Sequence, residues 1–544
     1  MIADTVITGG RIFLGLAEGF AEALAIRDGR ILASGSAHAM RDLAGPGTRT
    51  IELAGRVAVP GFNDAHMHFQ MLGVGMTEVR LRPEEGVRSV DEVLRRVADA
   101  ARTKAPGEWI QGRGYDQNEF DEPRHPTAEE LDRAAPNHPV YVKRTCGHVA
   151  VANTRALRQA GITPGTPSPD GGLIERRDAR LTGLLAERAM LLVSAVIPKP
   201  SKDDCLAAIG RAGAFMLSQG FTSVMDAAVG HMAGTVELDA YEHAAASGTL
   251  PLRTWVILYG DPGGIADAAY EAGYRNGREI GLLRYGGVKI FADGSAGGLT
   301  AAMSEPYRVG DPGNRGILVY PDEEAHRLLA AYHRRGYQLA IHAIGDAAIE
   351  QILSGIERCD APDAPIAGRR HRIEHCGFLT EGQRRRMAAS GIHPVPQPIF
   401  MYEFGDLYLQ NVGEARAAAA YPMRRWLESG QNPAASSDSP VSTTDPFKSL
   451  YAMTTRRTRR GTVIGPDERL TMAEAIHAYT YCGAFSQFAE DRYGRLIPGQ
   501  RADVAILSRD VFACPPEVLE TDVRCDLTIL DGRVVFDRSG QSAA

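Results

Sequence analysis

Two histidines stand two positions apart just after a short apolar run. His66 and His68 follow the Val-Ala-Val segment 57–59 and a Pro-Gly break. If this stretch is extended, side chains at positions i and i+2 point to the same side, so both imidazoles aim at one spot. Neutral imidazoles that converge at a strand end suit a transition metal. The alternative is a pair of surface histidines on a loop, which is common for an isolated His-x-His.

The same pattern recurs along the chain, because other metal-type side chains lie in or at the end of short apolar segments. These side chains are Lys289, His342, His375 and Asp438. Parallel strands of a barrel present the residues at their carboxyl ends on one face. The pattern therefore predicts that four histidines, one lysine and one aspartate gather at one end of a barrel.

Lys289 is the unusual member of this set, because its neighbours on both sides are apolar. Burying its ammonium group costs several kcal/mol unless the charge is paired. One interpretation is a buried salt bridge with Asp293. The other is an amine that desolvation keeps neutral and that captures carbon dioxide. The resulting carbamate is an anionic, bidentate oxygen ligand that can bridge two metal ions.

The middle of the chain alternates short apolar strands with amphipathic helices, which is typical of parallel βα units. The expected strands are 221–225, 253–258, 287–291, 338–341, 371–374, 393–396 and 433–437. The clearest expected helices are 203–218, 322–336, 346–358 and 380–390. Together with the stretch that ends at His66, these make eight strands. The pattern predicts a (β/α)8 barrel with its active residues at the carboxyl strand ends.

The two chain ends carry short β-type runs separated by Asp-Gly turns, which are strong hairpin signals. They predict an accessory sheet domain built from residues 1–58 and 495–544 around a barrel of residues 59–494. Residues 70–200 are too long for one βα connection. They contain helix patterns at 89–104, 127–135 and 181–195, and we expect them to form an insertion over the barrel mouth.

The composition of the 544 residues excludes several classes of protein. A hydrophobic content of 44% and a charged content of 23% are ordinary for a soluble globular protein. A net charge of −7 provides no basic field for a nucleic acid. No apolar run is long enough to span a membrane, and no signal peptide is evident. Seven dispersed cysteines indicate reduced thiols. We therefore expect a cytoplasmic protein with a small-molecule substrate.

The motifs that carry these residues resemble those of the amidohydrolase superfamily, and most closely its YtcJ-like (amidohydrolase 3) branch, which includes N-substituted formamide deformylases. The matching stretches are 60–68, 288–295, 341–346, 372–375, 437–440 and 498–504. The resemblance runs nearly from end to end. It implies a distorted TIM (β/α)8 barrel, a β-sandwich built from both termini, and metal at the barrel mouth.

The resemblance also implies a set of metal ligands, which are His66, His68, Lys289, His342, His375 and Asp438. The first two would bind the more buried ion, the lysine carbamate would bridge, and the other two histidines would hold a second ion. Histidine and carboxylate ligands suit one or two Zn²⁺ per chain, with Mn²⁺ or Fe²⁺ as alternatives. A homodimer is expected from the resemblance alone.

The implied function is hydrolysis of a C–N bond in a small, N-substituted amide or formamide by a metal-activated hydroxide. Asp438 would act as general base and then as acid to the leaving nitrogen. The structural alternative for this aspartate is a helix N-cap. Rival functions are a deaminase or cyclic-amide hydrolase that uses the same site, and a metal-binding barrel without turnover.

Three weaker candidates could meet the substrate. His148 lies in a Gly-His segment after a strand-like run, and a satisfied structural histidine is an equal alternative. Asp116 follows a Gly-Arg-Gly turn, and a purely structural turn is the stronger interpretation. Gln397 follows Pro-Val-Pro and could reach the pocket. The identity of the substrate depends on the insertion and on the loops after the strands.

Overall fold

The structure is a computed structural model that describes residues 1–144, 149–169 and 172–540. The chain divides into two compact units. One comprises Met1–Gly73 together with Ser201–Ala544, and the other is Val74–Pro200. Among the described residues, no helix is both long and apolar enough to cross a membrane.

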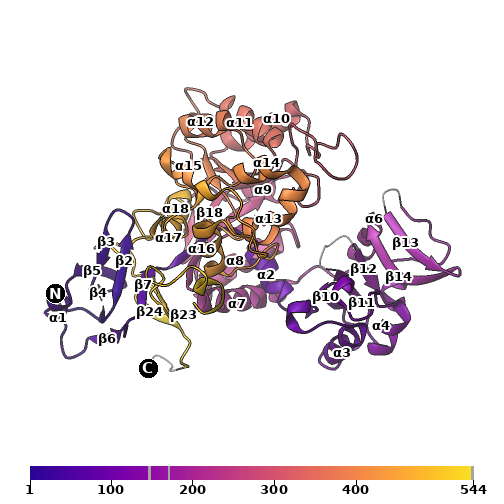
Figure 1. The fold of residues 1–544 in the computed structure, drawn as a ribbon, viewed down its shortest axis with the longest axis horizontal. Helices are drawn as coiled ribbons and strands as arrows, with labels where there is room; N and C mark the ends of the chain where they lie inside the picture. Colours follow the sequence, from indigo (N-terminus) through magenta and orange to yellow (C-terminus); the bar gives the residue numbers. More distant parts are fainter. Residues whose placement is uncertain (145–148, 170–171, 541–544) are drawn as a thin grey trace. The chain divides into compact units, whose positions relative to one another are not determined.

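The larger unit contains a nearly closed barrel of seven parallel strands (Figure 1). In spatial order they are β21 (His393–Val395), β20 (Arg372–His375), β19 (Leu339–Ala343), β18 (Leu283–Phe291), β16 (Arg253–Tyr259), β15 (Phe221–Val229) and β8 (Phe62–Met67). A short strand, β17 (Glu279–Ile280), pairs antiparallel with β18. Every residue of β8, β15 and β20 is buried, as expected for strands covered on both faces.

The prediction of an eighth strand at 433–437 is wrong, because that segment does not form a strand. It lies between β21 and β8 and makes only isolated backbone bonds to each. Ala434 donates to the carbonyl of Pro394 at 3.2 Å, and Ala435 accepts from Ala65 at 3.4 Å. The N–H of Ala435 turns to Ala478 instead, at 3.0 Å, so no regular ladder forms. The segment still fills the gap between the two end strands.

Helices follow the barrel strands, as the amphipathic patterns predict. They include α7 (Lys202–Ser218), α8 (Thr235–Ala246), α10 (Asp322–Arg334), α11 (Asp346–Glu357), α12 (Glu381–Ser390), α13 (Ile399–Val412), α16 (Pro446–Thr455) and α17 (Met472–Ala478). Ser201 and Asp204 form a capping box that starts α7, and Thr380 and Gln383 do the same for α12. Local capping thus sets where these helices begin.

The chain ends contribute two further sheets. One orders β5 (Arg30–Gly35), β4 (Ala23–Arg27), β1 (Thr5–Thr8) and β6 (Arg49–Glu52). The other orders β24 (Arg533–Asp537), β23 (Cys525–Leu530), β22 (Val504–Leu507), β7 (Val57–Pro60), β2 (Arg11–Gly15) and β3 (Gly19–Ala21). Side chains from both sheets, among them Ile7, Ile26, Val504 and Ile529, share one apolar cluster. That these sheets form a β-sandwich domain with the expected boundaries stays a prediction.

The unit Val74–Pro200 is built on a sheet of which the sequence patterns indicated only the run at 140–143. Its strands are β13 (Gly172–Arg177), β14 (Arg180–Glu187), β12 (Val149–Ala152), β11 (Val140–Arg144), β10 (Ile110–Tyr115) and β9 (Val79–Arg80). The helices expected at 89–104 and 127–135 are present as α3 (Val90–Ala101) and α4 (Ala128–Ala134). The prediction of a helix at 181–195 is wrong in its first half, because the first half is strand β14, which pairs with β12 and β13. Only α6 (Arg188–Ser194) is helical.

Candidate metal centre

Strand β8 carries His66, and His68 directly follows its last residue. A buried aspartate fixes this end of the strand. Asp64 is fully buried, and its Oδ1 accepts the backbone N–H groups of His66 at 3.2 Å and Ser437 at 3.1 Å. One carboxylate oxygen therefore ties the strand that carries His66 to the segment that carries Asp438. Two backbone hydrogen bonds join the same segments. The N–H of Asp438 donates to the carbonyl oxygen of His66 at 2.7 Å, and the N–H of His68 donates to the carbonyl oxygen of Ser439 at 2.7 Å.

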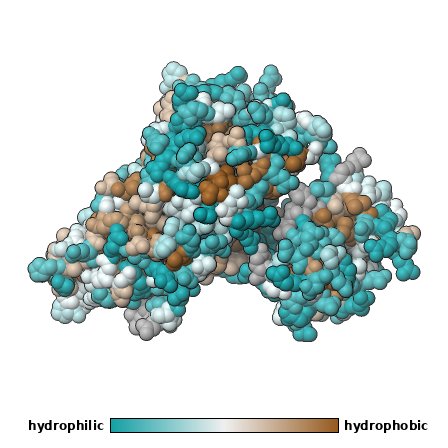
Figure 2. All heavy atoms as spheres, in the orientation of Figure 1, coloured by the Kyte–Doolittle hydropathy of each residue, from teal (hydrophilic) through white to brown (hydrophobic). Residues whose placement is uncertain are grey.

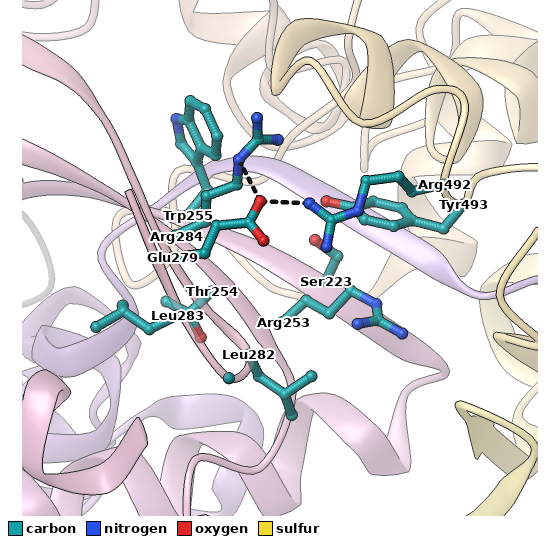
Figure 3. A pocket seen from close by; sticks show the side chains of 11 residues that line it. Ser223, Arg253, Thr254, Trp255, Glu279, Leu282, Leu283, Arg284, Arg492 and Tyr493 are labelled. Atoms are coloured by element: carbon teal, nitrogen blue, oxygen red, sulfur yellow. Dashed lines mark hydrogen bonds and ion pairs between the residues drawn. The ribbon is translucent and has the colours of Figure 1, made fainter. Parts of the chain in front are cut away.

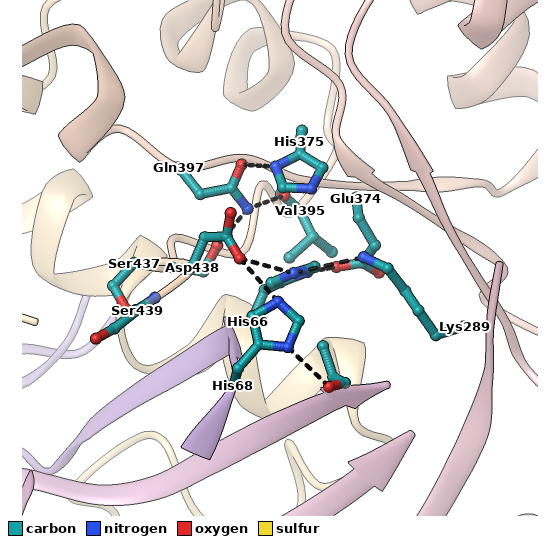
Figure 4. Close-up of polar contacts among 12 residues, drawn as sticks. His66, His68, Lys289, Glu374, His375, Val395, Gln397, Ser437, Asp438 and Ser439 are labelled. Atoms are coloured by element: carbon teal, nitrogen blue, oxygen red, sulfur yellow. Dashed lines mark hydrogen bonds and ion pairs between the residues drawn. The ribbon is translucent and has the colours of Figure 1, made fainter. Parts of the chain in front are cut away.

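The Nε2 atoms of both histidines converge on one oxygen of Asp438. Oδ1 lies 3.4 Å from Nε2 of His66 and 3.3 Å from Nε2 of His68 (Figure 4). These three residues offer ligand atoms that all lie within 4.8 Å of one another. The structure thus brings together three of the residues that the sequence selects.

Lys289 lies next to His66 of this group. It is fully buried on β18, and its Nζ lies 3.5 Å from Nε2 of His66 and 4.9 Å from the centre of the Phe291 ring. The suggested partner Asp293 is occupied elsewhere, since it accepts backbone N–H groups from Ala302, Ile344 and Gly345. The ammonium group therefore lies beside the histidines and away from this carboxylate.

His375 and His342 extend the cluster along the neighbouring strands. The His375 ring lies 5.0 Å from that of His66 and 4.3 Å from that of His342, measured between ring centres. Nε2 of His342 lies 3.0 Å from the carbonyl oxygen of Gly294. The imidazole of His342 is thus near the group but is engaged by a backbone acceptor.

Each of the other three histidines is oriented by a partner on its Nδ1 atom. Glu374 contacts Nδ1 of His66 at short range. The carbonyl oxygen of Ala227 lies 2.9 Å from Nδ1 of His68, and Oε1 of Gln397 lies 2.7 Å from Nδ1 of His375. Because these partners are acceptors, the proton resides on Nδ1 in each ring. The Nε2 lone pair is then free for a metal, as in other protein metal sites.

Several of these residues have a left-handed backbone, which residues other than glycine rarely adopt. The φ angles are +68° at His375, +49° at Cys376 and +58° at Asp438. Such conformations cost of order 1–3 kcal/mol each and persist where the surroundings enforce them. The backbone bond from Asp438 to His66 is part of that enforcement.

Burial controls the charge states of the group. Desolvation and the charge of Lys289 lower the pKa of His66, and desolvation and the nearby His342 lower the pKa of His375 well below its usual value. Desolvation also lowers the pKa of Lys289 to about 8. Burial alone would raise the pKa of Asp438, but the imidazoles of His66 and His68 beside it hold that pKa well below its usual range. Desolvation alone would lower the pKa of His68, but the neighbouring Asp438 carboxylate raises it, so this ring must be in its neutral form when a divalent cation binds.

The donor set fits a metal ion. Oδ1 of Asp438 is buried and has no hydrogen bond of good geometry, although two imidazole nitrogens lie within 3.4 Å of it. A buried oxygen without a hydrogen-bond donor is costly unless a cation satisfies it. Two imidazoles and one carboxylate are also the ligand types that zinc prefers in catalytic sites.

The three substrate candidates lie in different surroundings. Gln397 is fully buried, and its amide bonds to His375 and, at 3.0 Å, to Ser436, so it stands behind the histidine. Asp116 belongs to the unit Val74–Pro200, where it pairs with Arg144 at 2.7 Å and caps a short turn. His148 lies outside the described residues.

The opposite end of the barrel carries a cavity of a different kind (Figure 3). Its lining includes the amino ends of β16 and β18, where Arg284 pairs with Glu279 at 2.9 Å and Arg492 contacts the same carboxylate. Its volume of about 20 Å³ is that of a single water site. Residues at this end of a barrel usually serve stability.

Sequence reasoning missed the residues that support the ligands. Glu374 and Arg372 are fully buried and pair with each other, and Asp64 links two segments of the site. One signal was available for the pair, since two charged residues at positions i and i+2 of a buried strand must be paired. No local signal points from Asp64 to Ser437, because 373 positions separate them.

Comparisons with known proteins agree with this geometry. Residues 49–536 match the model of the Amidohydrolase family. The chain is 31% identical to YtcJ of Bacillus subtilis (strain 168), a protein named as an amidohydrolase, over 98% of this chain and 99% of the relative. It is 30% identical to the N-substituted formamide deformylase of Arthrobacter pascens over 96% of each chain.

A solved structure shows the same arrangement at the level of the fold. An uncharacterized metal-dependent hydrolase from Pyrococcus furiosus superposes with a TM-score of 0.77 and 30% sequence identity, covering 93% of this chain and 99% of the other. The family match spans most of the sequence, and the fold and the donor set agree with it. The chain therefore belongs to the Amidohydrolase family and is a hydrolase that acts on carbon–nitrogen bonds.

Proposed function

We propose that this protein hydrolyses the C–N bond of a small amide, with N-substituted amides and formamides as its substrate class. The observation that carries the proposal is the convergence of ligand atoms from His66, His68 and Asp438 within 4.8 Å at the carboxyl end of the barrel. The similarity to an N-substituted formamide deformylase supports the substrate class.

In this proposal His66, His68 and Asp438 hold a divalent ion, with Zn²⁺ favoured and Mn²⁺ or Fe²⁺ as alternatives. When bound, such an ion lowers the pKa of a water molecule and polarises a carbonyl oxygen. The protein contributes the orientation of the two histidines through Glu374 and the carbonyl of Ala227. It also contributes burial, which strengthens every electrostatic contact inside the site.

Lys289 is proposed to carry a carbamate. Desolvation lowers its pKa to about 8, so the neutral amine is accessible near neutral pH. The nitrogen lone pair attacks carbon dioxide, a C–N bond forms as one C–O π bond opens, and the nitrogen loses one proton to water. The anionic product would supply oxygen ligands next to His66, and His342 and His375 would then hold a second ion.

Asp438 is proposed to move the proton of the reaction. Its low pKa keeps it a carboxylate at neutral pH, so it can accept a proton from the attacking water. The water oxygen bonds to the carbonyl carbon, and the C–N bond then breaks. Asp438 returns the proton to the departing nitrogen, which leaves as an amine while the acyl part leaves as a carboxylic acid.

The surroundings of the site favour an apolar substituent on the substrate nitrogen. Phe291 lies 5.3 Å from the ring of His342, and Tyr259 lies 6.4 Å from Phe291. Both residues end barrel strands, so this aromatic wall stands beside the ligands. A hydrophobic band also crosses the face where α13 lies (Figure 2), and Leu407 of α13 is 37% exposed. Aromatic and aliphatic groups would bind such a wall by burial of apolar area.

One observation favours a second candidate, a deaminase or cyclic-amide hydrolase with a single ion. Nε2 of His342 is held by the carbonyl of Gly294, so this histidine would have to break that contact to bind a second ion. The number of metal ions per chain separates the two candidates.

The test uses the full-length protein purified without chelators. We expect hydrolysis of some members of a panel of formamides and acetamides whose N-substituents range from methyl to aryl, with equal amounts of amine and acid released. Removal of the metal should abolish the reaction, and Zn²⁺ should restore it. Metal-loaded protein that cleaves no amide on the panel, yet releases ammonia from amino-substituted rings, would favour the deaminase.

A further inference from the structure

A fully buried chain of charges lies behind one of the histidine ligands. Arg372, Glu374 and His66 have no exposed surface. The guanidinium group of Arg372 donates to both carboxylate oxygens of Glu374, at 2.9 Å for the Nη2–Oε2 contact. The same Oε2 contacts Nδ1 of His66. Figure 4 shows Glu374 directed at His66 from the side opposite Asp438.

Arg372 also holds the strand that carries the histidine. Its Nη2 donates to the carbonyl oxygen of Ala65 at 2.6 Å, and its Nη1 lies 3.5 Å from the hydroxyl of Ser486. Because Arg372 and Glu374 stand two positions apart on β20, both side chains point into the barrel interior. A single guanidinium group therefore fixes the carboxylate and the backbone of β8 in one arrangement.

The partner of His66 differs in charge from those of the other oriented histidines. His68 faces a backbone carbonyl and His375 faces a neutral amide, whereas His66 faces a carboxylate. A carboxylate on Nδ1 fixes the tautomer and makes the imidazole a stronger donor through Nε2. That Nε2 atom is the one that lies 3.4 Å from Asp438.

We propose that Glu374, clamped by Arg372, is the positioning residue that determines how tightly the site retains its metal ion. This inference rests on the proposed metal site but concerns affinity for the ion and not turnover. Glu374 contacts His66 at Nδ1, and Arg372 contacts Glu374, so both act through the histidine and neither is a catalytic residue. Their contribution is to hold His66 with its proton on Nδ1.

The test measures Zn²⁺ affinity of metal-free full-length protein by competition with a chromophoric chelator, without substrate. We expect Glu374→Gln to bind Zn²⁺ about 10–100-fold more weakly than wild type. The matched control is Asp503→Asn, which neutralises another buried carboxylate that pairs with an arginine, Arg253, at 2.9 Å but lies at the other end of the barrel. The control should bind Zn²⁺ as tightly as wild type.

A second variant separates ligand positioning from folding. Glu374→Gln leaves the charge of Arg372 unpaired and can destabilise the protein. The double variant Arg372→Met/Glu374→Gln removes both charges, so it should recover thermal stability yet keep the weak Zn²⁺ binding. If both variants unfold, neutron diffraction of the wild type locates the deuteron of His66, which we expect on Nδ1.

The outcomes distinguish this inference from the proposed function. Wild-type protein that takes up no Zn²⁺ would overturn the proposed metal site itself. Wild-type binding together with unchanged affinity in the folded Glu374 variants would overturn only the role of Glu374. A deuteron found on Nε2 of His66 would also overturn the role of Glu374.

Discussion

The backbone N–H of Asp438 donates to the carbonyl oxygen of His66 at 2.7 Å, although 372 positions separate the two residues in the sequence. This bond joins a loop residue with a left-handed backbone to a barrel strand. It brings the carboxylate of Asp438 to Nε2 of His66 in β8 and to Nε2 of His68, which directly follows β8. Such an arrangement explains how a residue outside any regular element can hold a fixed position.

Asp438→Asn should keep the fold and most of the metal but lose turnover by about 10²–10⁴-fold, because an amide cannot accept the proton. Measurement of kcat beside elemental analysis checks this. The matched control is Asp445→Asn. Asp445 caps α16 through Phe447 at 3.0 Å, and asparagine caps helices equally well. Near-normal kcat in Asp438→Asn would remove this residue from the proton-transfer role.

The link made by Asp64 can be tested with two substitutions at one position. Asp64→Asn retains an oxygen that can accept from His66 and Ser437, so its free energy of unfolding should match that of wild type. Asp64→Ala leaves both buried N–H groups without an acceptor, and we expect a loss of about 1–3 kcal/mol for each. Urea unfolding monitored by circular dichroism measures both variants. Equal stability of the alanine and asparagine variants would contradict the link.

A pair of buried histidines predicts loss of stability in acid. Leu339 N–H donates to Nδ1 of His371, Nε2 of His371 lies 2.8 Å from Nδ1 of His333, and Nε2 of His333 lies 2.8 Å from the carbonyl of Ala364. In this series of hydrogen bonds each ring carries one proton, and both nitrogens of each ring have a hydrogen-bond partner. Protonation of His371 would break it, and burial lowers the pKa of His371 to about 3.

The sign of the pH effect follows from that pKa. The unfolded chain binds the proton near pH 6.5 and the folded protein only near pH 3, so this contribution to stability is complete above about pH 6.5 and is lost as the pH falls toward 3. Each linked proton changes the free energy of unfolding by about 1.4 kcal/mol per pH unit. Urea unfolding between pH 7 and 4 should show a smaller slope in His371→Asn, whereas the exposed His38→Asn should keep the wild-type slope.

The proposed carbamate predicts a dependence on carbon dioxide. Metal-free protein reconstituted with Zn²⁺ and bicarbonate should bind about two ions per chain, and Lys289→Met should bind about one. Elemental analysis gives the ion count, and a carbon-13 signal from labelled bicarbonate reports the modified lysine. One ion per chain with an unmodified lysine would favour the single-ion hydrolase or deaminase.

The sequence alone determined the alternation of strands and helices, and it singled out the candidate ligands of the site. Strand periodicity, capping residues and the positions of His66, His68, Lys289, His375 and Asp438 are local features, so they can be read from neighbouring residues. The helices α7, α10, α11 and α12 begin within one residue of their expected starts. The capping boxes that start α7 and α12 are each encoded within a few neighbouring positions.

Only the tertiary structure decided what depends on partners far away in the chain. The segment 433–437 resembles a strand, yet Ala435 bonds to Ala478 and leaves the ladder. The segment at 181–187 resembles a helix, yet two neighbouring strands pair with it. Asp64, Arg372 and Glu374 gained roles through contacts across hundreds of residues, and His342 turned to Gly294. Hydrogen bonding between distant segments outweighs local preference here, because buried polar groups must find partners wherever the fold provides them.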